Sequence, residues 1–271
     1  MKKIAILLAA SAVTSLACLA SLTSMAQARE LRVGSECTYP PFNFKDASGT
    51  LQGFDVDVAK EVGKRVGADI SFVCQPFDSL IPALMAGKFD MLAASMSITD
   101  ERKKSIEFSL PYRSSTARFI AAKGSSLAPL TADGKANPDG IKGKAIAIQR
   151  SSTYEKYMRD KFPDADIVLY DTVDNMLLDL TSKRVDLVFA GPIKLAQDFL
   201  DKPRGKDYAF VGPEINDVEF FGPGVGIGLR KDDTKLRDEV DGALKAMFAD
   251  GAFKAINDKY WSFSVLPAAT Q

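Results

Sequence analysis

The sequence predicts an α/β protein of two similar lobes, each with a mostly parallel sheet flanked by helices. Three observations support this fold class. Short apolar strands alternate with amphipathic helices along most of the chain, as they do around parallel sheets. A pattern of thirteen residues occurs twice, each time before a strand. Two further strand-like segments cross between the regions that contain these copies, and the 271 residues are enough for two cores.

The first β-α-β unit lies near the start of the chain. "LRVGSE" (31–36) is an apolar strand, "GFDVDVAKEVGKRVG" (53–67) is a helix, and "ADISFVC" (68–74) is a second strand. The helix has an apolar stripe at every fourth residue, formed by Phe54, Val58, Val62 and Val66. If the two strands are neighbours, the residues that follow them meet at the edge of the sheet where α/β proteins bind ligands.

The repeated pattern consists of "DSLIPALMAGKFD" (78–90) and "DNMLLDLTSKRVD" (174–186). Both copies begin and end with Asp, and both have Leu at the sixth step. We expect each copy to form a helix that leads into a buried strand, the first of which runs from Asp90 to about Ser95. The second copy is preceded by strand, helix and strand, so the two regions are interpreted as equivalent lobes.

Two crossings then divide the chain. The stretch 109–140 begins as a crossing strand and becomes a surface loop rich in Pro, Gly and Ser, and 220–233 is a glycine-rich crossing strand. Helices are expected at 233–248 and 251–259. The predicted domains are 29–113 plus 222–271 for the discontinuous first lobe and 114–221 for the second lobe, with a hinge at the crossings.

Residues 1–28 read as a cleavable signal peptide. Two lysines precede a long uncharged stretch that ends in Ala26-Gln27-Ala28, a small-x-small cleavage pattern. A membrane anchor and a lipoprotein modified at Cys18 are the alternatives. Export to the periplasm is therefore expected. Cleavage leaves 33 basic and 35 acidic residues, a net charge of −2, which gives no basic surplus for nucleic acid.

The sequence contains no histidine, which removes the commonest general base and metal ligand and excludes Ser-His or Cys-His nucleophiles. No cofactor and no metal site is expected. Beyond residue 28 only Cys37 and Cys74 remain. In an oxidising compartment they predict one disulfide, and two separate buried thiols are the alternative.

"AASMSITDER" (93–102) predicts an anion site in the first lobe. Ser95 and Ser97 follow a buried strand, Thr99 is a suitable N-cap, and Arg102 falls in the first helical turn. Hydroxyls, free N–H groups, a helix N-terminus and a guanidinium all favour a small carboxylate or phosphate. The alternative is structural: Thr99 only caps the helix and Arg102 pairs with an adjacent acid.

The second lobe offers a counterpart in Ser151, Ser152 and Thr153, which precede a helix and are expected to direct N–H groups into the space between the lobes. In the first lobe Glu36 ends a strand, where a buried carboxylate needs a partner such as a cationic ligand group. Tyr39 and Phe77 are candidate aromatic walls for that ligand, although simple rim packing is common for such residues.

These motifs together resemble the periplasmic solute-binding proteins of polar amino-acid ABC importers. "GFDVDVAKEVGKRVG" resembles that family's signature helix. Its other landmarks are matched in order by "TYPPFNF", "LIPALMAGKFDMLAASMSITDERKKSIEFSLPY", "DLTSKRVDLVF" and "GVGIGLRKDD". The similarity is greatest to the branch that binds lysine, arginine, ornithine or histidine, which also contains opine-binding proteins. It implies a two-lobe periplasmic-binding-protein fold of type II that closes by a two-strand hinge on one amino acid and performs no chemistry.

The resemblance also implies roles for individual residues. Arg102 would hold the ligand α-carboxylate, with help from Ser95 and Ser152, and Ser97 would accept from the α-ammonium. Tyr39 and Phe77 would enclose the ligand side chain, and Glu36 would meet its distal cationic end. The protein would act as a monomer and dock on a membrane ABC permease.

Two positions depart from the family pattern. Gly191 stands where relatives commonly have an aspartate that pairs with the α-ammonium, and Ala94 stands where a hydroxyl is common. A free α-ammonium would lose its main counter-charge, and charge-assisted hydrogen bonds are worth about 1.5–3 kcal/mol each. An opine, an arginine derivative with a substituted α-nitrogen such as octopine or nopaline, is therefore the alternative ligand. Arg150 is a third unusual residue, where relatives have glycine.

Two other classes of function are carried as alternatives. The same fold hosts periplasmic cyclohexadienyl-type dehydratases, so the fold alone does not exclude catalysis. Glu36 would be the candidate acid, but no partner is expected to tune it. A sensory domain would normally be joined to a membrane helix or a kinase.

Overall fold

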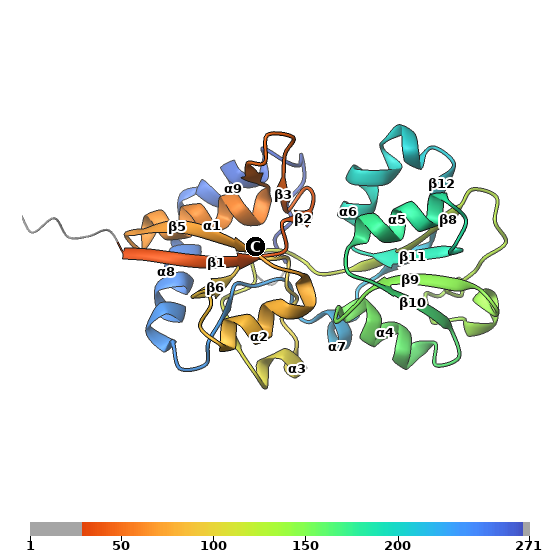
Figure 1. The fold of residues 1–271 in the computed structure, drawn as a ribbon, viewed down its shortest axis with the longest axis horizontal. Helices are drawn as coiled ribbons and strands as arrows, with labels where there is room; N and C mark the ends of the chain where they lie inside the picture. The colour runs from red at the N-terminus through yellow and green to blue at the C-terminus, as the bar shows by residue number, and fades with distance from the viewer. Residues whose placement is uncertain (1–28, 268–271) are drawn as a thin grey trace, which may run out of the picture.

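The computed structural model describes residues 29–267, which form two lobes, each built around one large sheet (Figure 1). The expected signal peptide and Cys18 lie outside this range. Both sheets contain five strands and carry helices on both faces, so the predicted α/β fold of two lobes is confirmed. None of the helices within 29–267 is both long and apolar enough to cross a membrane.

The first sheet is built around the predicted β-α-β unit. β1 pairs in parallel with β5 on one side and with β6 on the other, while β13 runs antiparallel between β6 and β7. A small antiparallel sheet of β2, β3 and β4 follows β1. The strands are β1 (Arg29–Ser35), β2 (Thr38–Tyr39), β3 (Asn43–Lys45), β4 (Leu51–Gln52), β5 (Ala68–Cys74), β6 (Met91–Leu92), β7 (Glu107–Phe108) and β13 (Gly228–Leu229).

The helices of this lobe cover both faces of the sheet. α1 (Phe54–Arg65) buries Phe54, Val58 and Val62 of the predicted stripe and packs on α8 (Thr234–Asp250) and α9 (Ala252–Asn257). On the other face α2 (Leu80–Met85) contacts β1 and β6, and α3 (Asp100–Lys103) follows (Figure 1). A short 3₁₀ turn, Phe77–Ser79, precedes α2.

The second sheet has the same arrangement of strands as the first. Its order is β10-β9-β11-β8-β12, in which β8 is antiparallel to both neighbours, as β13 is in the first sheet. The strands are β8 (Ala117–Ala122), β9 (Ala145–Gln149), β10 (Asp166–Tyr170), β11 (Leu187–Ala190) and β12 (Tyr208–Ile215). The helices are α4 (Thr153–Lys161), α5 (Val173–Thr181), α6 (Pro192–Leu195) and α7 (Val218–Phe221), with α5 and α6 on one face and α4 and α7 on the other (Figure 1).

The repeated pattern forms equivalent structures, and its last Asp has the same task in both lobes. Asp90 Oδ2 accepts a hydrogen bond from the Arg32 N–H at 2.9 Å, and Asp186 Oδ2 accepts from the Ala145 N–H at 3.0 Å. In both cases the backbone N–H of the aspartate donates back to the same partner residue at 2.8 Å. Each carboxylate thus fixes where a central strand begins relative to the strand beside it.

Three predicted elements differ from the structure. The strand expected from Asp90 to Ser95 pairs only over Met91–Leu92, because the chain then turns into the site. The strand expected at the start of 109–140 is β8 at 117–122, which does not merely cross between the lobes but lies inside the second sheet. The crossing at 220–233 is a strand only at Gly228–Leu229, because Gly222 and Gly224 adopt positive φ angles and approach the backbone of neighbouring segments.

The repeated aspartate generates a prediction about stability. Asp186→Ala removes the acceptor of a partly buried N–H group, so we expect the free energy of unfolding to fall by about 1 kcal/mol. Asp186→Asn keeps an oxygen at this position, so it should lower the free energy of unfolding clearly less than Asp186→Ala does. Urea denaturation of the three proteins measures the difference. Equal midpoints for the alanine variant and the unsubstituted protein would contradict this role.

Candidate functional site

The site lies where the carboxyl end of β1 in the first sheet meets the carboxyl end of β9 in the second. A cavity of about 20 Å³ remains between the lobes at this point. Most of the predicted site residues line it, and they come from both lobes. They are Glu36, Tyr39, Phe77, Ala94, Ser95, Ser97, Arg102 and Ser152. Gln149, Thr153 and Tyr154 complete the lining.

Arg102 brings a desolvated positive charge to this cavity. Thr99 caps α3 by accepting from the Arg102 N–H, as predicted. The guanidinium donates to the Ser97 carbonyl at 2.9 Å and to the Ser151 carbonyl of the second lobe at 3.2 Å. Among residues 29–267 no carboxylate pairs with it, and burial lowers its pKa to about 10. The structural alternative of a pair with Asp100 or Glu101 is therefore wrong.

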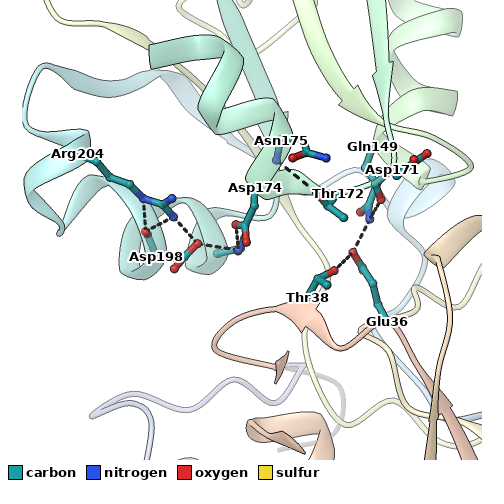
Figure 2. Close-up of polar contacts among 10 residues, drawn as sticks. Glu36, Thr38, Gln149, Asp171, Thr172, Asp174, Asn175, Asp198 and Arg204 are labelled. Atoms are coloured by element: carbon teal, nitrogen blue, oxygen red, sulfur yellow. Dashed lines mark hydrogen bonds and ion pairs between the residues drawn. The ribbon is translucent and has the colours of Figure 1, made fainter. Parts of the chain in front are cut away.

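Glu36 brings a buried carboxyl group to the same cavity. Its side chain is only 6% exposed, and burial raises the pKa of the carboxyl to about 7. Oε1 accepts from Thr38 Oγ1 at 2.9 Å and from Gln149 Nε2 of the second lobe at 2.9 Å (Figure 2). Both partners are neutral, and no cation within the described chain forms an ion pair with this carboxylate. The neighbouring Cys37 forms the predicted disulfide with Cys74 at the end of β5.

Ser95 and Ser97 lie between these charges, but their hydroxyls already have partners. Ser95 has a positive φ of 51°, and its hydroxyl donates to Asp55 Oδ2 at 2.8 Å. Asp55 also accepts from Asn43 and from Tyr112, so one buried carboxylate holds the strand end in place. Ser97 shares a hydrogen bond of 2.8 Å with Ser115. The hydroxyl proton of Ser95 is thus committed to Asp55, and the Ser97 hydroxyl and carbonyl are already bonded to Ser115 and Arg102.

The start of α4 closes the cavity from the second lobe. Ser152 is the N-cap residue, and its hydroxyl accepts from the Glu155 N–H and donates to the Gln149 carbonyl. The N–H groups of the first helical turn have no partner within the helix, so they favour an anion beside Arg102. Ser151 has a positive φ of 58° and contributes its carbonyl to Arg102 rather than a wall to the cavity.

Aromatic and small residues form the remaining walls. Tyr39 is buried and stacks on Phe42, while Phe77 lies under the guanidinium of Arg102, whose Cζ is 5.5 Å from the ring centroid. Ala94 is 1% exposed and adds no polar group. The two rings therefore bound the same cavity.

Gly191 is placed differently from the other predicted residues. It begins α6 and lines a second cavity of about 300 Å³, which adjoins the first through Tyr39. A Cβ at this glycine would lie 3.0 Å from the hydroxyl oxygens of both Tyr39 and Tyr154. Gly191 thus lies beside the small cavity, at its junction with a larger one.

Several residues of the site were missed by the sequence analysis. Gln149 ends β9 and bonds to Glu36, and the strand-end argument that identified Glu36 also applies to it. Lys194 is fully buried, with ion pairs to Asp174 at 2.8 Å and Asp198 at 2.7 Å, and its Nζ lies 5.6 Å from the Tyr39 ring centroid. Figure 2 shows Asp174 between Asp198 and the Glu36–Gln149 contact. No sequence pattern indicates this lysine.

Arg150 turns away from the predicted anion site. Its Nε lies 2.7 Å from Asp171 Oδ1, and the side chain is 42% exposed. It is therefore a surface ion pair and does not supply a second contact to the anion.

The lobes touch one another around the cavity. Glu36 bonds to Gln149, Arg102 bonds to the Ser151 carbonyl, and Trp261 Nε1 donates to Gln197 Oε1 at 3.1 Å. A positive charge at one end and a negative charge at the other leave a site that is complementary to a small ligand with both charges. Two lobes with such a site between them define a ligand-binding protein of the two-lobe class.

The comparisons with known proteins agree with this class. Residues 31–263 match the family model of bacterial extracellular solute-binding proteins, family 3, and the chain belongs to this family. It is 40% identical to the L-arginine-binding protein of Pseudomonas aeruginosa over 98% of both chains. It is 38% identical to the lysine/arginine/ornithine-binding periplasmic protein of Escherichia coli, over 87% of this chain and 88% of that protein.

A solved structure also matches the whole fold. The similar protein is a periplasmic binding protein of Salmonella typhimurium described as having high arginine specificity. It is 33% identical, with a TM-score of 0.79, over 87% of this chain and all of that chain. The predicted periplasmic-binding-protein fold and the predicted family are therefore both confirmed, and the relatives are binding proteins rather than enzymes.

The raised pKa of Glu36 predicts how stability depends on pH. The folded protein binds a proton at Glu36 up to about pH 7, whereas an unfolded glutamate releases it near pH 4.3. Stability from this group is therefore present at low pH and is lost as the pH rises through about 7. Relative to Glu36→Gln, the unsubstituted protein should lose up to about 3 kcal/mol between pH 4.5 and pH 8.

Urea denaturation of both proteins at pH 4.5, 6 and 8 measures this difference. Because the other titrating groups are common to both proteins, they cancel in the comparison. A difference in unfolding free energy that stays constant with pH would show that Glu36 is not desolvated as the structure indicates.

Proposed function

We propose that this protein captures a cationic amino acid, arginine first of all, and delivers it to the membrane permease of an ABC importer. The observation that carries this proposal is the pair of desolvated charges at the cavity, Arg102 and Glu36. Burying an ion without a counter-ion costs several kcal/mol, so a ligand that supplies both counter-charges is strongly favoured. An amino acid with a carboxylate at one end and a cation at the other meets this requirement.

The proposed contacts follow from the lining of the cavity. The guanidinium of Arg102 holds the α-carboxylate in a bidentate pair, and the N-terminus of α4 adds N–H donors from the second lobe. Tyr39 and Phe77 enclose the aliphatic part of the ligand, and Glu36 accepts from its distal cation. Arginine is preferred because its planar, permanently charged fork matches a carboxylate better than an ammonium does.

Binding requires the lobes to open, since residues of both lobes line the cavity and hydrogen bonds from Glu36 to Gln149 and from Arg102 to Ser151 join the lobes across it. We infer a hinge at the two crossings, one between β7 and β8 and one between β12 and β13, with lobe boundaries near residues 113 and 222. The ligand first contacts the lobe that carries Arg102, and the second lobe then adds Ser151, Ser152 and Gln149. Closure is favoured because only the closed form contacts the ligand from both sides.

The periplasm is the proposed location, supported by the named periplasmic relatives and by the sequence of residues 1–28. We also propose a monomer that binds without catalysis. Glu36 is the carboxyl group that an enzyme would use as its catalytic acid. Its hydrogen-bond partners, Thr38 and Gln149, do not titrate, so neither can exchange a proton with it. Turnover of prephenate or arogenate by the purified protein would overturn this part of the proposal.

Isothermal titration with L-arginine, L-lysine, L-ornithine, L-histidine and the uncharged L-glutamine tests the ligand class. We expect the basic amino acids to bind and glutamine to bind at least tenfold more weakly, because it leaves the Glu36 carboxylate without a counter-charge. Glutamine binding as tightly as arginine would contradict the role of Glu36.

Arg102→Ala should abolish measurable binding of these ligands, and Arg102→Lys should bind at least tenfold more weakly because it loses the bidentate geometry. Arg184→Ala is the matched control, since Arg184 is an exposed arginine that pairs only with Asp179. Melting temperatures of the ligand-free variants verify folding. Unchanged affinity in Arg102→Ala would sink the proposed function.

A further inference from the structure

A contact between the lobes lies outside the ligand cavity and is not used by the proposed binding. It is made by α6 and the π-helical turn Ala196–Leu200 that follows it, on the side of the second lobe toward β2 (Figure 1). In this turn Gln197 Oε1 accepts a hydrogen bond from Trp261 Nε1 of the first lobe at 3.1 Å. Neither residue lines the cavity at Arg102 and Glu36, so the bond joins the lobes without touching a ligand there.

The first lobe holds the indole of Trp261 in a fixed position. The side chain is 4% exposed, and its ring packs on Phe54 at a centroid distance of 4.8 Å and on Phe42 at 5.7 Å. A buried indole N–H needs a hydrogen-bond partner, and here the second lobe supplies it. When the lobes separate, the ring stays with the first lobe, and the N–H exchanges Gln197 for water.

A second contact from the same segment meets the same group of rings. Lys194 lies three residues before Gln197, and its Nζ is 5.6 Å from the ring centroid of Tyr39. Two aspartates of its own lobe hold this buried lysine in ion pairs. Tyr39 stacks on Phe42, which in turn contacts Trp261. One segment of the second lobe therefore faces a continuous row of aromatic side chains in the first.

The hydrogen bond between Trp261 and Gln197 contributes to the closed arrangement alone, because water solvates both groups in an open cleft. A hydrogen bond of ordinary net strength changes an equilibrium constant about three- to tenfold. Since the ligand-bound protein is closed and the free protein must open to admit a ligand, this factor enters the affinity. The bond touches no ligand, so the factor is the same for every ligand.

We propose that the Trp261–Gln197 hydrogen bond is a latch, formed by two positioning residues that strengthen the binding of all ligands equally. This inference rests on the proposed function, because the latch acts through closure of the lobes over a cationic amino acid. It separates two properties of the site. Arg102 and Glu36 determine which ligand is bound, whereas the latch determines how strongly the closed form holds any of them.

Isothermal titration of two variants with L-arginine, L-lysine and L-histidine tests the latch. Trp261→Phe and Gln197→Leu should each raise the Kd of every ligand that binds by about three- to tenfold, with unchanged ratios between ligands. Gln197→Glu keeps an acceptor oxygen and should weaken binding clearly less than Gln197→Leu. Gln52→Leu is the matched control, since Gln52 is an exposed glutamine of β4 in the first lobe, and it should leave each Kd unchanged.

The double variant Trp261→Phe/Gln197→Leu should bind no more weakly than either single variant, because both substitutions break the same bond. Melting temperatures of the ligand-free proteins verify folding, and the half-buried Gln197 carries the test if Trp261→Phe fails to fold. A Kd that is unchanged in the single variants, losses that add in the double variant, or altered ratios between ligands would overturn the latch and leave the proposed function intact. Absence of binding to the unsubstituted protein would overturn the proposed function.

The emission of Trp261 gives an independent measurement, because this residue is the single tryptophan of the chain. Saturating L-arginine should change the emission of the unsubstituted protein, as the indole N–H passes from water to Gln197. The change should be smaller in Gln197→Leu, where no acceptor replaces the water. Emission that does not respond to bound arginine would contradict the latch.

Discussion

The site depends on two opposite charges that are withdrawn from water at the two ends of one small cavity. Arg102 donates only to backbone carbonyls, and Glu36 accepts only from a hydroxyl and an amide. Neutral partners reduce the cost of desolvation without cancelling either charge, as the lowered pKa of Arg102 and the raised pKa of Glu36 indicate. The direction in which a ligand lies in the site follows from the positions of these two groups.

The scaffold keeps both charges at fixed positions. Asp55 joins the start of α1 to Ser95 and Tyr112, which holds the segment after β6 against the neighbouring helix. Cys37 and Cys74 join the segments that leave β1 and β5, directly beside Glu36. These bonds lie within the first lobe, so the proposed motion is placed at the two crossings rather than within the lobe.

Most of the fold follows from local patterns in the sequence, and so do the two charged residues. Helix periodicity predicted α1, and strand ends predicted where Glu36, Ser95 and Arg102 meet. The sequence predicted a strand in this part of the chain, but it did not predict that β8 lies inside the second sheet, because its pairing with β11 and β12 is entirely non-local. Lys194 was not predictable either, since its ion pairs come from helices that only tertiary packing brings together.

Two uncompensated charges also explain how the proposed closure would discriminate between ligands. A ligand that lacks the cation leaves Glu36 with its neutral partners when the lobes close, and a ligand that lacks the carboxylate does the same to Arg102. Each missing ligand charge raises the free energy of the closed state alone, because in an open cleft water solvates both groups. A ligand with both charges removes both penalties, so the population of the closed form depends on the whole ligand. The selection therefore acts on the equilibrium between open and closed lobes as much as on the first encounter.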